Sequence, residues 1–336
     1  MARPLAILRA LGLAYRRDWT ALQSLAGNNF FLITAVLLQK AGTFVYLIMG
    51  LIVLFPLSTD PLRKIPASRL ALWPLERRER WILRLLSPWI NPLTWGLAAL
   101  AAWGAGRMLS AGVWMALAGL CGAIFLVPAL PLPGTSGMWR RVPPFPGRLN
   151  QLVRKNLREM LCTLDFYCAL GLSLAVAAYR VFGPPLPAEA FTAMTVLVVG
   201  ALSSYAQCLF GLDGAGGLSR CRLLPLPGWQ LLLAKDAAFL VVAVLLTLPL
   251  GVLPGVGAAL VALALGHAPS VEHPRPQTRW RFSSGGALGN AVVQVVALAM
   301  AASAIAWTSA WFLAPAVGAW VVSVWWYGRD VENVLG

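Results

Sequence analysis

Charged residues are scarce in this sequence, and most of those present are basic. They make up 12% of the 336 residues, against about 25% in a soluble domain, whose surface must face water. Only 12 residues are acidic and two are histidine, whereas hydrophobic residues reach 59%. Stretches such as Phe239–Leu253 and Ala291–Ile305 carry no ionisable side chain. This composition excludes an ordinary soluble domain and predicts an integral membrane protein.

The apolar residues form continuous blocks, which favours membrane-spanning helices over a β-barrel. In lipid, every backbone N–H and C=O must be paired within the protein, and a helix does this inside one segment. A barrel strand instead alternates apolar and polar residues over roughly ten positions. We therefore predict an all-α, polytopic membrane protein.

Sequence signals of several other protein classes are missing. The first 19 residues have no apolar core followed by a cleavage site, so we interpret them as a cytosolic amphipathic segment and not a signal peptide. No Gly-x-x-x-x-Gly-Lys-Ser/Thr loop is present, and the segment Asp213–Leu218 is rich in glycine but has no lysine. We predict no cofactor and no catalytic residue in this chain, so any enzymatic activity depends on a partner.

Cysteine and histidine do not form a recognisable metal site. The five cysteines lack Cys-x-x-Cys spacing and lie in or beside apolar segments, where we interpret them as packing residues. His267 and His273 are six residues apart, with a proline between them and no third ligand nearby. We predict that this stretch is a solvated loop.

The basic residues are concentrated in short tracts between the apolar blocks. Positive residues are retained on the cytoplasmic side of a membrane. We therefore predict a cytoplasmic (inner) membrane protein with both termini in the cytoplasm, where these tracts also lie: Arg3–Arg17, Arg63–Arg84, Arg140–Arg158, Arg220–Arg222 and Arg275–Arg281.

An even number of crossings must then separate each tract from the next. The sequence accommodates five hairpins, or ten spans, in an N-terminal half (1–151) and a C-terminal half (152–336). If 19–57 is one span plus a surface helix, the count is nine. The turns within the last two hairpins are predicted at the proline-containing stretches Leu253–Gly255 and Leu313–Pro315. The predicted spans are 19–39, 42–57, 92–108, 112–130, 164–182, 190–212, 231–251, 254–267, 289–309 and 312–327.

Two of the cytoplasmic tracts resemble each other. Ser68–Leu75 aligns with Ser219–Leu226 at an offset of 151 residues (219 − 68), with identities at Ser, Arg, Leu, Pro and Leu. This indicates two related halves, as in many transporters. Chance similarity in a chain rich in these residues is the alternative.

The first copy leads into a predicted amphipathic helix over Glu76–Leu86. Proline is well placed in the first turn of such a helix, where its missing N–H has no cost. Apolar residues from Trp81 to Leu86 lie on one face, while Arg77, Arg80 and Arg84 lie on another. This pattern is typical of a helix at the membrane surface. It either anchors the chain to anionic lipid or docks a cytosolic protein.

At these residues the chain resembles the permease subunits of ABC-2-type ABC transporters. The resemblance rests on the pattern Leu-Leu-Pro-Leu-x-x-x-Gln-Leu-Leu-x-x-Lys over Leu223–Lys235 and on the basic helix Val153–Leu161. It implies a cytosolic ATP-binding subunit as partner, a homo- or heterodimer of permeases, and alternating access driven through cytoplasmic loops. Such permeases usually have six spans, and ten are counted here.

The resemblance also implies which residues transmit force from the ATPase. They lie in the two similar loops and the helices that follow them: Arg69, Leu72, Pro74, Leu75, Glu76, Arg77, Arg80, Arg220, Leu223, Pro225, Leu226 and Gln230.

Few polar residues fall within the predicted spans. We expect Asp165 and Asp236 near cytoplasmic helix ends, offset by Arg158 and Lys235, and we expect Arg180 to extend outward. Amide side chains within spans are expected to bond helix to helix, namely those of Asn28, Asn29, Asn290 and Gln294.

Two other functions compete with the permease hypothesis. In the first alternative, the chain is a structural or assembly subunit of a larger membrane complex. The scarcity of polar residues within the spans fits this alternative equally well. The second, an intramembrane lipid-modifying enzyme, lacks a convergent set of His, Asp and Glu in the sequence. The predicted interior, with its few charges, suits a lipidic or amphipathic substrate better than an ion. Because the basic residues lie in short tracts between apolar blocks, we predict no nucleic-acid partner.

Overall fold

The computed structural model describes residues 2–17, 62, 72–90, 147–182, 188–213, 226–274, 283 and 288–335. Within these ranges the chain forms helices and turns, with no strand. By its contacts it divides into two compact units, residues 1–23 with 34–134 and residues 24–33 with 135–336. The four spans predicted at 19–39, 42–57, 92–108 and 112–130 lie outside the described residues.

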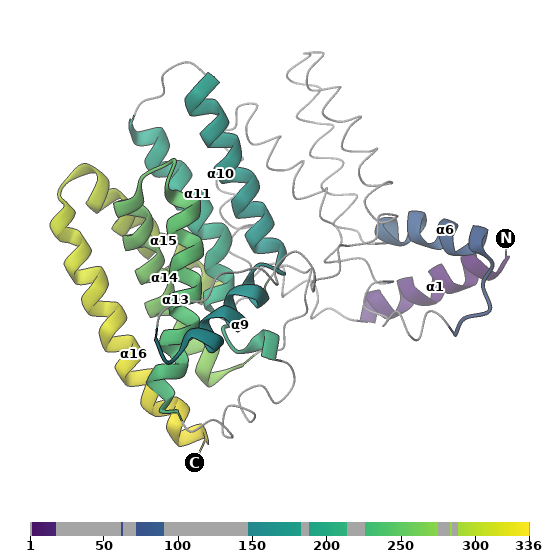
Figure 1. Cartoon of the computed structure of the whole chain (residues 1–336). Helices are drawn as coiled ribbons and strands as arrows, with labels where there is room; N and C mark the ends of the chain where they lie inside the picture. The colour runs from purple at the N-terminus through teal and green to yellow at the C-terminus, as the bar shows by residue number, and fades with distance from the viewer. Residues whose placement is uncertain are drawn as a thin grey trace. The chain divides into compact units, whose positions relative to one another are not determined.

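The described part of the first unit consists of short helices. Helix α1 (Ala2–Arg17) packs against α6 (Arg77–Leu86), which continues into a 3-10 turn, η4 (Ser87–Ile90). Figure 1 shows α1 and α6 side by side. The amphipathic helix predicted after Pro74 is therefore confirmed.

Helix α6 begins at a capping box. The Glu76 side chain accepts from the backbone N–H of Glu79, and the Glu79 carboxylate accepts from the Glu76 N–H at 3.2 Å. These bonds satisfy two N–H groups that lack an intrahelical acceptor. On the apolar side, Leu83 is buried, whereas Trp81 is 51% exposed. The start of α6 is thus fixed by its own sequence, while an aromatic side chain stays on its surface.

The described part of the second unit begins with the amphipathic helix α9 (Asn150–Met160) and continues as a bundle of six long apolar helices. Each of the six is long and apolar enough to cross a membrane. They are α10 (Leu164–Phe182), α11 (Ala188–Ala206), α13 (Gly228–Thr247), α14 (Val252–Glu272), α15 (Leu288–Trp307) and α16 (Leu313–Leu335). Helix α14 contacts α11, α13, α15 and α16 and is the centre of the bundle; the labelled helices can be followed in Figure 1.

The last six predicted spans each correspond to one of these helices, with shifted ends. The prediction 164–182 is matched in full. The turn between α13 and α14 lies at 248–251 and not at Leu253–Gly255, and the turn before α16 lies at 308–312 and not at Leu313–Pro315. Both turns were predicted at proline, but Pro254 and Pro315 occupy the first turns of their helices, where proline is tolerated.

The predicted loop at His267 is wrong. Helix α14 does not end at residue 267 but continues to Glu272, with Pro269 inside it. Proline removes one hydrogen bond from the helix, and neighbouring helices in a membrane bundle compensate for such losses. Both Pro269 and His267 are buried by these neighbours. A histidine expected in water is therefore in the interior of the bundle.

Close helix contacts depend on glycine. A Cβ atom on Gly266 of α14 would lie 2.5 Å from the carbonyl oxygen of Ala206 in α11. Likewise, a Cβ atom on Gly228 of α13 would collide with the carbonyl of Gly328 in α16. Small residues allow helix backbones to approach closely in membrane proteins. Glycine therefore allows close contact of α14 with α11 and of α13 with α16.

Candidate functional site

Three polar side chains from different helices meet inside the bundle. Asp236 of α13, His267 of α14 and Ser323 of α16 form what we call the Asp-His-Ser cluster. The His267 Nε2 atom lies 3.0 Å from Asp236 Oδ1, and the Nδ1 atom lies 2.8 Å from Ser323 Oγ. Ionisable residues inside a membrane bundle are costly and mark functional sites by default. The cluster is therefore the leading candidate site in the described part of the chain.

Two further hydrogen bonds complete the cluster. The Trp320 indole N–H donates to Asp236 Oδ2 at 2.8 Å, and the Ser323 hydroxyl donates to the Ala264 carbonyl at 2.8 Å. Asp236 and His267 are both fully buried. The tryptophan and serine come from adjacent turns of α16, so this one helix closes the cluster at both ends.

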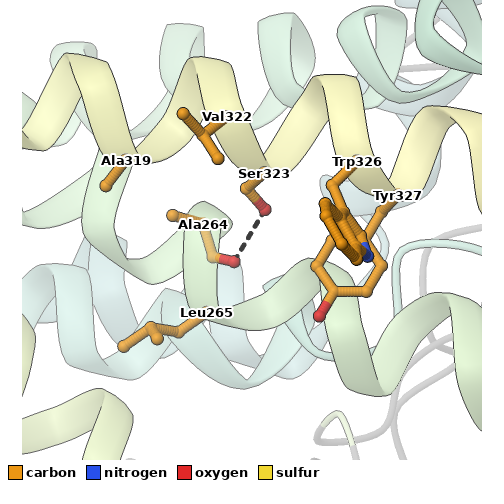
Figure 2. A pocket seen from close by; sticks show the side chains of 7 residues that line it. All are labelled: Ala264, Leu265, Ala319, Val322, Ser323, Trp326 and Tyr327. Carbon is orange, nitrogen blue, oxygen red and sulfur yellow. Dashed lines mark hydrogen bonds between the residues drawn. The ribbon is translucent and has the colours of Figure 1, made fainter.

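A pocket of about 390 Å³ adjoins the cluster. It lies between α14 and α16, and its wall is mostly apolar. Figure 2 shows the Ser323 hydroxyl directed to the Ala264 carbonyl, with the rings of Trp326 and Tyr327 together at one end. Ser323 thus belongs both to the cluster and to the pocket. The lining residues are Ala264, Leu265, Ala319, Val322, Ser323, Trp326 and Tyr327.

This convergence is not predicted by the sequence. No set of His, Asp and Glu residues was expected to meet, and Asp236 was expected to be offset by its neighbour Lys235. The three cluster residues are 31 and 56 positions apart in the sequence, and no short motif joins them. The signal that was present is the histidine itself, one of only two in the chain, inside an apolar stretch.

Hydrolase triads also have a histidine that is hydrogen-bonded to a serine on one side and to an aspartate on the other. In such a triad the serine hydroxyl is hydrogen-bonded to the imidazole, which removes its proton during attack. Here the hydroxyl donates to the Ala264 carbonyl. The arrangement is therefore better suited to holding a proton on His267 than to activating Ser323 as a nucleophile.

Lys235 belongs to a second buried group, which we call the Lys-Asp cluster. Its Nζ atom lies 2.8 Å from Asp213 Oδ2 and donates to the Leu209 carbonyl at 2.7 Å. Lys155 of α9 also forms an ion pair with Asp213. The Phe210 ring lies 4.8 Å from the ammonium nitrogen, within the range of a cation–π contact. This cluster connects α9 and α13 to the 3-10 turn η7 (Gly211–Asp213).

The charge of Asp213 is stabilised in the folded chain. Burial by itself raises the pKa of the carboxyl, but the positive charge of Lys235 and the hydrogen bonds from both lysines outweigh it, so the pKa is lowered. Because the pKa of Asp213 is lower in the folded chain than in the unfolded chain, the ionised carboxylate stabilises the fold at pH values above the ordinary carboxyl pKa of about 3.9. This stabilisation is lost as the pH falls through the pKa of the folded state.

We expect acid to weaken the Lys-Asp cluster. The melting temperature of the wild-type chain in detergent should fall between about pH 5 and pH 3, because protonated Asp213 no longer pairs with the lysines. The variant Asp213→Asn should be less stable at neutral pH and lose less stability over this interval. Glu189→Gln, at an exposed carboxylate, is the matched control and should keep the wild-type slope. An unchanged slope in Asp213→Asn would contradict the assignment.

Other intramembrane polar residues make structural contacts. Gln294 of α15 accepts a 2.5 Å hydrogen bond from Gln207 and donates to the Ala262 carbonyl at 2.6 Å. This confirms the expected helix-to-helix role of Gln294. The Asp165 Oδ2 atom accepts a 2.7 Å bond from the Ser283 backbone N–H.

The remaining predicted polar contacts are only partly described. Arg180 is exposed at the end of α10, as expected, and donates to the Pro249 carbonyl at 2.7 Å. Asn290 is also exposed. Asn28 and Asn29 lie outside the described residues.

The residues predicted to transmit force lie partly within the described chain. In the first unit, Leu72 is 82% exposed, Arg77 and Arg80 are exposed, and the Arg80 Nε atom donates to the Leu75 carbonyl at 3.0 Å. Pro74 and Glu76 are exposed beside them. In the second unit, Leu226 and Gln230 are half-buried at the start of α13. The others lie outside the described residues, namely Arg69, Arg220, Leu223 and Pro225.

The fold and composition together define a helical membrane protein. Among the described residues, no group of three His, Cys, Asp or Glu side chains is placed to hold a metal ion. Comparison of the chain with protein-family models, curated proteins and solved structures finds no match. The particular function therefore has to be argued from the chain itself.

Proposed function

We propose that the chain is the membrane-spanning permease subunit of an ATP-driven ABC-type transporter. The observation that carries this proposal is α6, a short amphipathic helix with an exposed arginine face directly after the Leu-x-Pro-Leu element. The chain has no phosphate-binding loop of its own, so a separate cytosolic ATPase supplies the energy. Its site of action is the cytoplasmic (inner) membrane.

Helix α6 has the properties of a coupling element. Its start is held by the capping box at Glu76 and by the bond from Arg80 to the Leu75 carbonyl. Force applied to the exposed Leu72 or Arg77 is therefore passed to a whole helix and not absorbed by a frayed end. Movement of α6 then favours one of two arrangements of the bundle, which is the basis of alternating access.

The experiment is purification of the chain from its native membrane. We expect an ATPase subunit to copurify. Changing both Pro74 and Leu75 to alanine should lower transport-coupled ATP hydrolysis by about tenfold or more, because both side chains belong to the loop through which the ATPase is proposed to act. ATP hydrolysis is measured in proteoliposomes that contain the purified complex.

The control variant is Arg148→Ala, at an exposed basic residue before α9. It should leave ATP hydrolysis unchanged. Recovery of the chain in a stoichiometric complex with other membrane subunits and no ATPase would contradict the proposal and favour the structural-subunit alternative.

A further inference from the structure

The hydrogen bonds of the Asp-His-Ser cluster determine its proton content. The Ser323 hydroxyl has one proton, which it donates to the Ala264 carbonyl. The contact of 2.8 Å between Ser323 Oγ and His267 Nδ1 therefore requires a proton on Nδ1. The 3.0 Å contact between His267 Nε2 and Asp236 Oδ1 also contains a proton, which is on Nε2 when the carboxyl is ionised, because an ionised carboxylate can only accept. With all contacts formed and Asp236 ionised, His267 is an imidazolium ion paired with the carboxylate.

The surrounding charges leave this pair isolated. Next to Asp236 on α13, Lys235 is engaged by Asp213 and the Leu209 carbonyl. From α16, Tyr327 places its ring 6.5 Å from the His267 ring, and the charged residues Arg329, Asp330 and Glu332 follow in the last turns of that helix. Helix α15 has no titratable side chain. On α11 the titratable residues are Glu189 and Tyr205, and on α14 itself Glu272 lies at the helix end. One bound proton therefore makes the buried pair electrically neutral.

Loss of that proton has two consequences at the pocket. The buried pair is left with one uncompensated negative charge, which is unfavourable in an apolar bundle. In addition, the Ser323 hydroxyl must turn from the Ala264 carbonyl to donate to the unprotonated Nδ1 atom. Ala264 and Ser323 both line the pocket, so this change in hydrogen bonding takes place at the pocket wall.

We propose that the Asp-His-Ser cluster is an intramembrane proton site and that the adjoining pocket binds an apolar ammonium ion in exchange for the proton. The positive charge of the ligand replaces that of the proton. Its N–H group donates to the Ala264 carbonyl, and the aromatic rings of Trp326 and Tyr327, which line the pocket, contact the cation. The pocket is open to the surface of the bundle, and its volume is about 390 Å³.

The entrance of the pocket also fits an apolar ligand. Val322 is 61% exposed and Trp326 is 59% exposed, on a helix that is long and apolar enough to span a membrane. A ligand dissolved in the lipid can therefore reach the pocket from the side of the bundle. All residues of the Asp-His-Ser cluster and the pocket lie in the second unit, so the proposed site does not depend on the presence of an ATPase.

The test is nitrogen NMR of the full chain in lipid nanodiscs, with ¹⁵N-labelled histidine. Only two histidines are present, and the variant His273→Asn leaves His267 as the sole source of imidazole signals. Before ligand is added, both ring nitrogens should show protonated shifts. Saturation with 2-phenylethylammonium should convert Nδ1 to the unprotonated shift and release about one proton per bound cation into a weakly buffered medium.

Matched ligands separate charge from hydrogen bonding. The neutral 2-phenylethanol has the same skeleton and should release no proton. The N,N,N-trimethyl analogue retains the charge but cannot donate, so it should bind about tenfold more weakly, the equivalent of one hydrogen bond. Release of a proton by the neutral alcohol would overturn the proposal, as would an unprotonated ring nitrogen in the absence of ligand.

A variant that leaves the cluster intact tests the pocket. Val322→Trp fills the entrance without changing Asp236, His267 or Ser323, so the nitrogen signals before ligand should match those of the parent chain. We expect binding of 2-phenylethylammonium to be lost. Unchanged proton release in this variant would show that the cation acts elsewhere and would overturn the assignment of the pocket.

Discussion

The variant Asp236→Ala is expected to lose about 3–5 kcal/mol of unfolding free energy, because it leaves a fully buried histidine without its counter-charge. It also removes the acceptor of the Trp320 indole N–H. Breaking a buried ion pair from one side costs more than the pair contributes, since the remaining charge stays desolvated. Unfolding by sodium dodecyl sulfate in mixed micelles, followed by circular dichroism, measures the loss.

Two comparison variants identify the cause of that loss. Asp236→Asn keeps an oxygen acceptor for one of the two bonds and should lose less than Asp236→Ala. Glu272→Ala removes an exposed carboxylate at the end of α14 and should stay within about 0.5 kcal/mol of the wild type. A loss below about 1 kcal/mol in Asp236→Ala would show that the cluster does not contain a buried ion pair.

The variant Gly266→Ala is expected to lose about 1–3 kcal/mol through a clash between helix backbones. The added Cβ atom would lie 2.5 Å from the Ala206 carbonyl oxygen and 2.6 Å from its carbon. Backbone atoms cannot turn aside as a flexible side chain can, so α14 must move away from α11. Because His267 follows Gly266 directly, this movement should also disturb the Asp-His-Ser cluster. The same unfolding measurement applies, with the ¹⁵N histidine spectrum as a second readout.

The control for Gly266 is another helical glycine with open space around it. A Cβ atom on Gly318 of α16 would have no neighbour within 4 Å. Alanine is preferred over glycine in a helix by up to about 1 kcal/mol. Gly318→Ala should therefore be neutral or stabilising, opposite in sign to Gly266→Ala. Equal effects of the two variants would mean that helix propensity, and not the contact with α11, determines the result.

Several elements of the bundle could be predicted from local sequence. The block 164–182 has apolar residues throughout, and its helix has the predicted ends. The pattern of Glu76 and Glu79 before an apolar and arginine-rich run predicts the start of α6, because a capping box acts within four residues. Predictions failed where they relied on proline as a terminator: Pro254 and Pro315 begin helices, and Pro269 lies inside one.

The sequence by itself determined the class of this protein, an all-helical chain with membrane-length apolar helices, since scarcity of charge and continuous apolar blocks are properties of composition and local order. Only the tertiary structure determined the site. The partners of Asp236, His267 and Ser323 come from three helices, and Lys235 turns to Asp213 although Asp236 is its neighbour. Which polar groups meet inside a bundle depends on helix rotation and close backbone contacts. Those are set by packing across the bundle, at positions such as Gly266, and not by local periodicity.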